Sequence, residues 1–232
     1  MYLIQRLNWD SDFLGFEVGA IWITDDDPSF SVENYNFSDY KLIYLFKPSR
    51  FHAVKIDSQF LVDVKYRYKM ALKTFETSST NKHEISIYSN STASDELIDL
   101  CISSGEYSRY KLDANFDRSV YPSLYKLWIT NALRRKKNEK VFICNIDGLF
   151  AGLIIVSFTS NLATIEILAV NEKYRGRGIA KSLIDISIKD SVEQGCTDLY
   201  VSTQQKNLSS CGLYESFGFK LESSTDVYHF WK

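Results

Sequence analysis

The chain has 232 residues, which fits one large domain or two small ones at roughly 100–200 residues per domain. Its 27 Lys and Arg against 29 Asp and Glu give a formal charge of −2, which argues against a nucleic-acid-binding protein. The sequence contains no run of about 18 apolar residues, and its N-terminal segment has no apolar signal core. We therefore expect neither a membrane span nor a secretory signal.

Cysteines and histidines are too scattered to indicate a metal site or a disulfide framework. The four cysteines lie far apart without a CxxC pair, which is typical of reduced thiols in a cytoplasmic protein. The three histidines are isolated, so a zinc hydrolase or a Ser–His–Asp hydrolase has little support. We expect a cytoplasmic protein without a metal. The aromatic fraction of 15% permits a homodimer interface without indicating one.

The first part of the chain has the pattern of short strands with mixed connections. Hydrophobic runs at 17–23 and 41–46 predict two strands, and a compact turn is expected around Gly15. Residues 60–70 alternate apolar and charged side chains with a period of two, which predicts a half-buried strand.

A junction between two regions is expected where two polar stretches follow each other. Residues 74–81 and 89–94 are rich in Ser, Thr and Asn, which predicts loops. We therefore divide the chain into an N-terminal α/β region, residues 1–85, and a C-terminal domain, residues 86–232.

The C-terminal domain has the alternating pattern of a mixed sheet flanked by helices. Asp147-Gly148 between two apolar runs is a strong hairpin signal. The pattern predicts an α/β (α+β) fold in which three antiparallel strands precede alternating helices and strands. The expected elements are helices at 95–104 and 122–137, strands at 140–146, 149–158 and 163–170, a helix at 178–191, a strand at 198–203, a helix at 208–217 and a terminal hairpin of 218–222 with 226–231.

Local signals predict the ends of the first two helices. Thr92 and Asp95 have the spacing of a capping box, and Gly105 stands where a helix-terminating glycine is expected. Pro122 suits the first position of the second helix. The cationic run at 134–137 is interpreted as a solvated helix end that complements the helix dipole, not as a nucleic-acid site.

Glycines are scarce, with 10 in the chain, so the close pair Gly176 and Gly178 stands out. The pair lies between a predicted strand and a predicted helix, together with Arg175 and Arg177. Such a turn exposes backbone N–H groups at a helix N-terminus, where they and the helix dipole favour a phosphate. The spacing matches neither a Walker loop nor a dinucleotide-binding fingerprint. The alternative is a glycine-softened turn that binds no ligand.

The same segment resembles the acyl-CoA signature of GNAT N-acetyltransferases, Arg/Gln-x-x-Gly-x-Gly/Ala. Arg175, Gly178 and Ala180 match it, whereas Asn171-Glu172 stands where the family often has proline. The resemblance implies a GNAT fold in which loop amides hold the pyrophosphate of acetyl-CoA and a bulged strand splays from the next parallel strand. The residues that it assigns to acetyl-CoA are Leu168, Ala169, Val170, Arg175, Gly176, Arg177, Gly178, Ile179, Ala180 and Asn207.

Two further residues are candidates for the chemistry. Asn207 and Tyr214, seven residues apart on one helix face, are similar to the second half of the family signature. The resemblance implies that Asn207 bonds to pantetheine and that Tyr214 donates a proton to the departing CoA thiolate. Glu166 is the candidate base for the attacking amine, or the anchor of a water molecule that serves as base. The alternative for Glu166 is a strand glutamate that faces solvent or forms an ion pair.

The N-terminal region narrows the acceptor. Residues 8–16 resemble the opening of TDP-fucosamine acetyltransferases, and Ser108-Arg109-Tyr110, followed by Tyr125 and Trp128, is similar to another segment of that group. The resemblance implies acetyl transfer from acetyl-CoA to the amino group of a nucleotide-linked 4-amino-4,6-dideoxyhexose. Arg109 is the candidate substrate-binding residue, with a loop-fixing role as its alternative. Acetylation of another small amine, amino acid or protein N-terminus, and a non-catalytic acyl-CoA-binding domain, stay open as alternatives.

Overall fold

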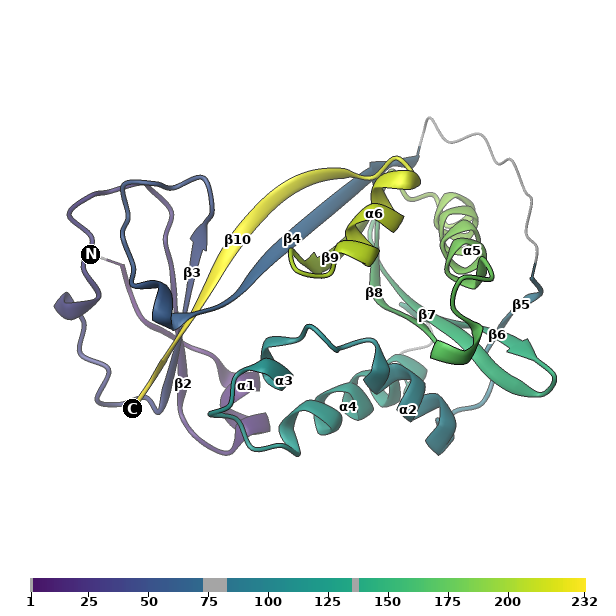
Figure 1. The fold of residues 1–232 in the computed structure, drawn as a ribbon, viewed down its shortest axis with the longest axis horizontal. Helices are drawn as coiled ribbons and strands as arrows, with labels where there is room; N and C mark the ends of the chain where they lie inside the picture. The colour runs from purple at the N-terminus through teal and green to yellow at the C-terminus, as the bar shows by residue number, and fades with distance from the viewer. Residues whose placement is uncertain (1, 73–82, 135–137) are drawn as a thin grey trace.

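The computed structural model describes residues 2–72, 83–134 and 138–232. Figure 1 shows strands and helices throughout this part of the chain. The strands are β1 (Gln5–Arg6), β2 (Val18–Trp22), β3 (Leu42–Pro48), β4 (Leu61–Ala71), β5 (Ile85–Ile87), β6 (Glu139–Ile146), β7 (Leu149–Thr159), β8 (Leu162–Val170), β9 (Asp198–Gln204) and β10 (Lys220–Trp231). The helices are α1 (Asn8–Leu14), α2 (Asp95–Ser103), α3 (Arg109–Leu112), α4 (Val120–Arg134), α5 (Ile179–Glu193) and α6 (Leu208–Ser216).

All ten of these strands form one mixed sheet in the order β1-β2-β3-β10-β4-β9-β8-β7-β6-β5. The pairs β2–β3 and β8–β9 are parallel, and the meander β6–β7–β8 is antiparallel, as the sequence predicts. The α/β class, with a mixed sheet flanked by helices, is confirmed.

Helices cover the two faces of the C-terminal half of the sheet. Helix α5 packs on β7 and β8 from one side, whereas α2 and α4 pack on β6, β7 and β8. Residues of β6 alternate between these layers: Phe142 and Cys144 belong to the core that includes α5, and Val141 and Ile143 belong to the core that includes α2 and α4. This alternation follows from the period of two along a strand.

Strands β4 and β10 connect the two predicted regions. In Figure 1 they run from the left half, which holds β2, β3 and both chain ends, to the right half. Strand β4, from residues 1–85, pairs with β9, and β10, from residues 86–232, lies between β3 and β4. The division at residue 85 stays a prediction about folding units, since the sheet itself crosses it.

The predicted terminal hairpin is wrong, because residues 220–231 form the single strand β10. The polar stretch that suggested a turn contains a bulge instead. Leu221 and Ser223 pair with the adjacent residues Tyr68 and Arg67, so Glu222 is the extra residue. A bulge bends a strand and increases its twist without ending its pairing. The strand can therefore reach β3 at its far end.

The compact turn expected around Gly15 is wrong in part, because α1 comes before it. Gly15 has a φ of 75° and ends α1, a seven-residue helix. Asn, Asp and Ser in α1 are poor helix formers, so local propensity did not indicate it. Its position against β2 stabilises it instead.

Two of the predicted helix ends differ in detail. Ser94, not Thr92, caps α2, since its side chain accepts the N–H of Leu97. Gly105 is needed for close packing: a Cβ at this position lies 2.3 Å from Cζ of Tyr125. Helix α4 begins at Val120, so Pro122 is its third residue.

Other predictions of local structure are confirmed. Asp147 and Gly148 both have positive φ, at 52° and 80°, in the turn between β6 and β7. Such a conformation matches the twist of the flanking strands. The predicted loop at 74–81 and the cationic residues 135–137 lie outside the described residues.

Three further observations concern the described residues alone. No helix among them is long and apolar enough to cross a membrane. No group of three or more His, Cys, Asp or Glu among them is arranged to hold a metal ion. The four cysteines are unpaired and buried.

Candidate functional site

A bulge separates the two central parallel strands. Ile165 pairs with Val156 and Ile167 pairs with Ile155, so Glu166 is an extra residue in β8. In a regular strand, residues two apart point to the same face of the sheet. The extra residue breaks this rule, because Ile165 belongs to the core with α5 whereas Ile167 belongs to the core with α2 and α4.

The two strands diverge beyond this bulge. Pairing of β8 with β9 covers Leu162–Ile165 and Asp198–Val201, although β8 continues to Val170 and β9 to Gln204. The splayed strands that the sequence predicts are confirmed. A gap between the strand ends exposes backbone groups that a ligand can satisfy, because unpaired backbone N–H and C=O groups require partners.

The glycine loop lies at the end of β8. Gly176 and Gly178 have φ of 76° and 89°, in the left-handed region that favours glycine. Gly178 is the N-cap of α5, so the first N–H groups of that 15-residue helix have no partner within the helix. The side chains of Arg175 and Arg177 are exposed beside them. Exposed helix N–H groups and two guanidinium groups form a site suited to a phosphate.

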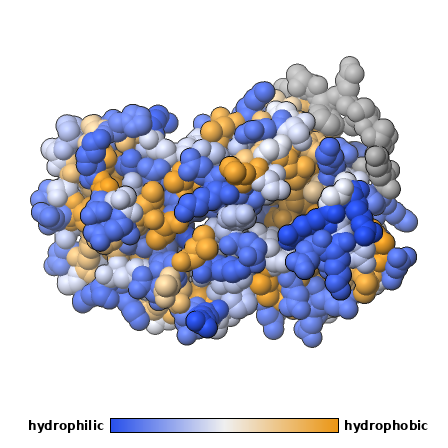
Figure 2. All heavy atoms as spheres, viewed as in Figure 1, coloured by the Kyte–Doolittle hydropathy of each residue, from blue (hydrophilic) through white to orange (hydrophobic). Residues whose placement is uncertain are grey.

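All ten residues that the resemblance assigns to acetyl-CoA line one cleft of about 1450 Å³. They come from the end of β8, the glycine loop, the start of α5 and the start of α6. In Figure 2 this region, on the right half of the view, is recessed, with hydrophobic residues at its base and hydrophilic residues around it. An apolar base with a polar rim is suited to a cofactor that has a slender arm and a phosphate group.

The opposite wall of the cleft was not predicted. It comes from the end of α2, the segment that leads into α3 and the end of α3, and it includes Ser103, Ser104, Glu106, Tyr107 and Leu112. No local motif marks these residues. They face the cleft because α2 packs across β7 and β8, which is a tertiary contact.

Helix α6 brings the two predicted signature residues to different depths. Asn207 lines the cleft and caps α6, since its side-chain oxygen accepts the N–H of Ser210 at 3.2 Å. Its amide NH2 can donate to a ligand in the cleft.

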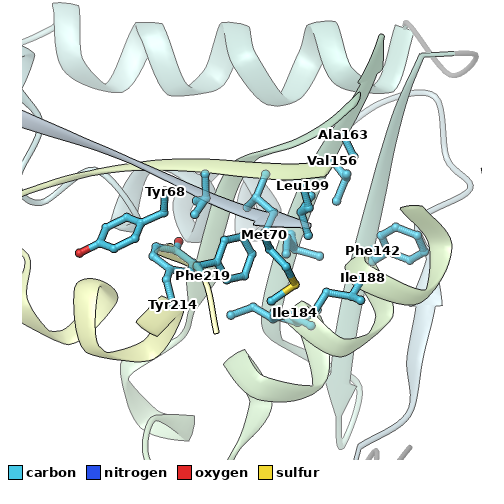
Figure 3. Packing of buried hydrophobic residues seen from close by; sticks show 14 of the residues in the cluster. Tyr68, Met70, Phe142, Val156, Ala163, Ile184, Ile188, Leu199, Tyr214 and Phe219 are labelled. Carbon is cyan, nitrogen blue, oxygen red and sulfur yellow. The ribbon is translucent and has the colours of Figure 1, made fainter. Parts of the chain in front are cut away.

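Tyr214 is 4% exposed and packs between Tyr68 and Phe219, with ring centroids 6.1 and 5.7 Å away (Figure 3). Burial raises the pKa of its phenol, so the hydroxyl keeps its proton at neutral pH. Tyr214 is absent from the residues that line the cleft. Its role as proton donor stays a prediction.

Glu166, the candidate base, is the extra residue of the bulge in β8. Its carboxylate accepts a hydrogen bond from the hydroxyl of Ser157 on β7 at 2.6 Å. Because Ser157 shares the face of Leu153 and Ile155, Glu166 points toward the side of the sheet that α2 and α4 cover. A carboxylate held there by one hydroxyl has a free oxygen that can accept a proton from an amine or from water.

Arg109, the predicted substrate-binding residue, lies among aromatic rings and carboxylates. Its guanidinium carbon is 4.5 Å from the ring centroid of Tyr44 and 4.8 Å from that of Tyr110. The guanidinium donates to the hydroxyl of Tyr110 at 3.0 Å, and that hydroxyl donates to Asp10. The Nε atom of Arg109 is buried without a hydrogen-bond partner in the described part of the chain. Its contact with an acceptor stays a prediction.

A carboxylate of β4, Asp63, was not predicted from the sequence. Burial raises its pKa to about 6, and the nearby charge of Arg109 opposes that rise. A carboxyl group of this kind changes its protonation near neutral pH, which is typical of functional sites. The alternation of 60–70 placed Asp63 on the polar face of the strand but could not show that this face meets α3.

A model of the acetyltransferase (GNAT) family matches residues 104–219 of the chain, which is half of its 232 residues. The match contains β8, the glycine loop, α5, β9 and α6. Acetyl-CoA is the acetyl donor of this family, and the residues of the cleft fit its pyrophosphate and pantetheine groups.

Known proteins resemble parts of the chain. A streptothricin acetyltransferase of Escherichia coli is 36% identical to it over 77 residues. This match covers 33% of this chain and 44% of that protein. N-alpha-acetyltransferase 30 of Saccharomyces cerevisiae is 40% identical to it over 55 residues. This match covers 24% of this chain and 31% of that protein. The chain thus spans less than half the length of these curated relatives.

One solved structure shares nearly the whole fold. A functionally unknown conserved protein from Staphylococcus epidermidis superposes with a TM-score of 0.66 at 11% identity, covering 98% of this chain and 91% of that one. This similarity concerns the fold alone. The family model matches half of the chain, and the match contains the glycine loop at the divergence of β8 and β9. The chain therefore belongs to the acetyltransferase (GNAT) family.

Proposed function

We propose that this chain is an acetyl-CoA-dependent N-acetyltransferase whose acceptor is the amino group of a nucleotide-linked amino sugar, with TDP-4-amino-4,6-dideoxyhexose as the first candidate. The observation that carries the acetyltransferase part is the convergence of all ten assigned residues on one cleft at the divergence of β8 and β9. The amino-sugar part is supported by the resemblance at residues 8–16 and 108–110.

The residues divide the chemistry between the two sides of the sheet. Amides of the glycine loop and the start of α5 bind the pyrophosphate, and Asn207 bonds to pantetheine. Acetyl-CoA supplies an acetyl thioester, so the amine nitrogen forms a bond to the carbonyl carbon while the carbon–sulfur bond breaks. A backbone N–H near Ala169 or Val170 stabilises the negative charge that develops on the carbonyl oxygen.

Two protons must move for the reaction to balance. The attacking amine loses one, and Glu166, or a water molecule that Glu166 holds, accepts it. The CoA sulfur gains one, and Tyr214 donates it. The two residues lie on opposite faces of the sheet: Glu166 lies with Ser157, and Tyr214 points from α6 into the core that includes α5. This placement suits an acceptor that enters from the side of Glu166.

A second candidate is the acetylation of a different amine. The curated relatives support it, because their names refer to streptothricin and to protein N-alpha groups rather than to a nucleotide sugar. A non-catalytic acyl-CoA-binding domain has less support, since a protein that only binds acyl-CoA has no need for a base or a proton donor at the reacting atoms.

A screen for acceptor-dependent release of CoA tests the proposal. Purified protein with acetyl-CoA is given TDP-4-amino sugars, amino acids, polyamines or no acceptor, and mass spectrometry locates the acetyl group. We expect turnover with the sugar nucleotides and acetylation of the sugar nitrogen. Turnover confined to non-sugar amines contradicts the proposed acceptor, and the absence of turnover with every amine contradicts the proposed activity.

A further inference from the structure

The middle of the sheet is only partly covered on one face. Helices α2 and α4 cover β6, β7 and β8 on this face, and the core that contains Phe116 covers β2 and β3. Strands β9 and β4 lie between these covered parts, where the four-residue helix α3 contacts β4. The side chains on this stretch are polar or charged, and we call them the charged strip: Asp63, Lys65 and Arg67 of β4 with Ser202 and Gln204 of β9.

Exposure shows that the strip is accessible to solvent. Lys65, Arg67 and Ser202 are exposed, although β4 and β9 are the fifth and sixth strands of ten. Central strands of a sheet are usually covered on both faces when helices flank the sheet. The exposed side chains of the strip therefore leave room for a ligand at the centre of the sheet.

The strip is adjacent to the candidate base. Val201 is the last β9 residue that pairs with β8, and its partner Ile165 comes directly before the bulge. Ser202 follows Val201 and pairs with Arg67 of β4. Glu166 is among the charges that act on Lys65, where it opposes the lowering of the pKa of that ammonium group. A ligand bound on the strip is therefore close to Glu166.

Most charges near the strip already have partners. Arg67 forms an ion pair with Glu222 at 3.5 Å, and Lys69 forms one with Asp198 at 3.1 Å. Asp63 lies within the field of Arg109. Lys65 differs from them, because within the described residues no ion pair within 4.0 Å or hydrogen bond involves its ammonium group.

The surroundings of Lys65 favour an anion. Desolvation and then the charge of Arg109 lower the pKa of its ammonium group, and Arg67 adds to this effect, whereas Asp63 and Glu166 oppose it. An anionic group placed on the strip reverses this repulsion and forms a charge-assisted hydrogen bond. The guanidinium of Arg109 is enclosed by the rings of Tyr44 and Tyr110, whereas the side chain of Lys65 is exposed and can touch a ligand.

We propose that Lys65, on the exposed stretch of β4 next to β9, the strand whose pairing with β8 ends at the bulge, binds an anionic group of the acetyl acceptor, a phosphate or a carboxylate. The site then selects molecules that carry both an amine and an anion. This inference rests on the proposed acetyltransferase function and makes its acceptor class more specific. In a nucleotide-linked amino sugar the anion is the diphosphate, and in an amino acid it is the carboxylate.

The test compares Lys65→Met with Lys69→Met. Both changes remove one ammonium group from the same face of β4, but Lys69 is already paired with Asp198. Steady-state kinetics are measured with a TDP-amino sugar, the same amino sugar without nucleotide, and an amino acid. Loss of a charge-assisted hydrogen bond predicts that Lys65→Met raises KM for the anionic acceptor on the order of ten- to hundred-fold. KM for acetyl-CoA and for the nucleotide-free sugar stays unchanged, and Lys65→Arg restores most of the loss.

Binding measurements keep the result independent of turnover. Calorimetric titration of TDP, inorganic pyrophosphate and glutamate into the full chain reports the anion site directly and separates a phosphate from a carboxylate. We expect weaker binding of at least one anion to Lys65→Met and unchanged binding to Lys69→Met. Equal binding to the wild type and Lys65→Met, or an equal loss in both variants, overturns the inference.

The two proposals fail in different ways. If the wild type acetylates TDP-amino sugars and Lys65→Met does so with the same KM, the anion site is wrong and the function stands. If the wild type acetylates only amines without an anionic group, both the amino-sugar acceptor and the anion site are wrong. If it acetylates only an anionic amine other than a sugar nucleotide, Lys65→Met with that amine decides the inference.

Discussion

The two faces of the sheet around β8, β9 and β4 differ in how the chain builds them. The face under α5 and α6 is a continuous hydrophobic core, and the glycine-loop wall of the cleft comes from residues close in sequence, 168–180. The opposite face carries the charged strip, together with Glu166 and Arg109, which come from distant parts of the chain. The comparison shows that the phosphate-binding wall of the cofactor cleft is encoded locally, whereas the acceptor side exists only after folding.

Tyr214→Phe tests the cofactor side with the largest expected effect. Phe keeps the packing against Tyr68 and Phe219 but cannot protonate the CoA thiolate, so we expect kcat to fall on the order of 100-fold with little change in KM. Tyr68→Phe is the matched control, because it removes a neighbouring phenol that donates to Glu215 instead. An unchanged kcat in Tyr214→Phe shows that another group is the acid.

Glu166→Gln tests the acceptor side with a somewhat smaller effect. The amide keeps the size of the side chain and its hydrogen bond from Ser157 but cannot accept the proton, so we expect kcat to fall about ten- to hundred-fold. Ser157→Ala serves as the comparison, since it removes the hydroxyl and leaves the base. If Ser157→Ala lowers kcat and Glu166→Gln does not, Glu166 acts neither as base nor as the anchor of a basic water.

Gly178→Ala separates backbone strain from ligand binding. At a φ of 89° an alanine costs about 1–2 kcal/mol, and the displaced loop amides bind phosphate less well. We expect KM for acetyl-CoA to rise about ten-fold while KM for the acceptor stays constant. Gly148→Ala, at a φ of 80° in the β6–β7 turn, carries similar strain away from the cleft. An equal rise in KM for both variants contradicts a phosphate site at the loop.

His229→Gln tests how the buried hydrogen bond between His229 of β10 and Asp113, near α3, contributes to stability. His229 on β10 is 3% exposed, and its Nδ1–H donates to Asp113, in the segment after α3, at 2.5 Å. Desolvation lowers the pKa of His229 below its ordinary value. As pH falls below about 6.5, the unfolded chain binds a proton that the folded chain does not, so the free energy of unfolding decreases.

The measurement is the change in Tm between about pH 7.5 and about pH 5. We expect the wild type to lose more stability over this range than His229→Gln, whatever the variant's Tm at the higher pH. Asp113 does not contribute in this window. Burial alone raises its pKa, but hydrogen bonds from His229 and Trp231 lower it, so its contribution is lost only below about pH 3.9. His52→Gln, at an exposed site, is the control, and equal slopes in all three proteins contradict the prediction.

Sequence reasoning was most successful where a structure depends on neighbouring residues. Asp147-Gly148 predicted its hairpin because two successive positive φ values are a local property. Sequence reasoning was less successful where tertiary packing determines the local structure. Glu222 falls within a polar stretch that suggests a turn, yet pairing with β3 and β4 keeps β10 continuous. Gly105 correctly predicted the end of α2, but local sequence could not show that a Cβ there would meet the ring of Tyr125.

By itself, the sequence determined the glycine loop, the order of elements around it and the ten predicted residues of the cofactor cleft. These features follow from backbone conformation and from periodicity along short segments, which neighbouring residues specify. The tertiary structure alone decided that Glu166 is the bulged residue, that β4 inserts beside β9, that the end of α2 and the segment after it close the cleft, and that the charges of Asp63, Lys65 and Arg109 act on one another. Pairing between distant strands and burial of charge depend on the whole chain, so no local pattern contains them.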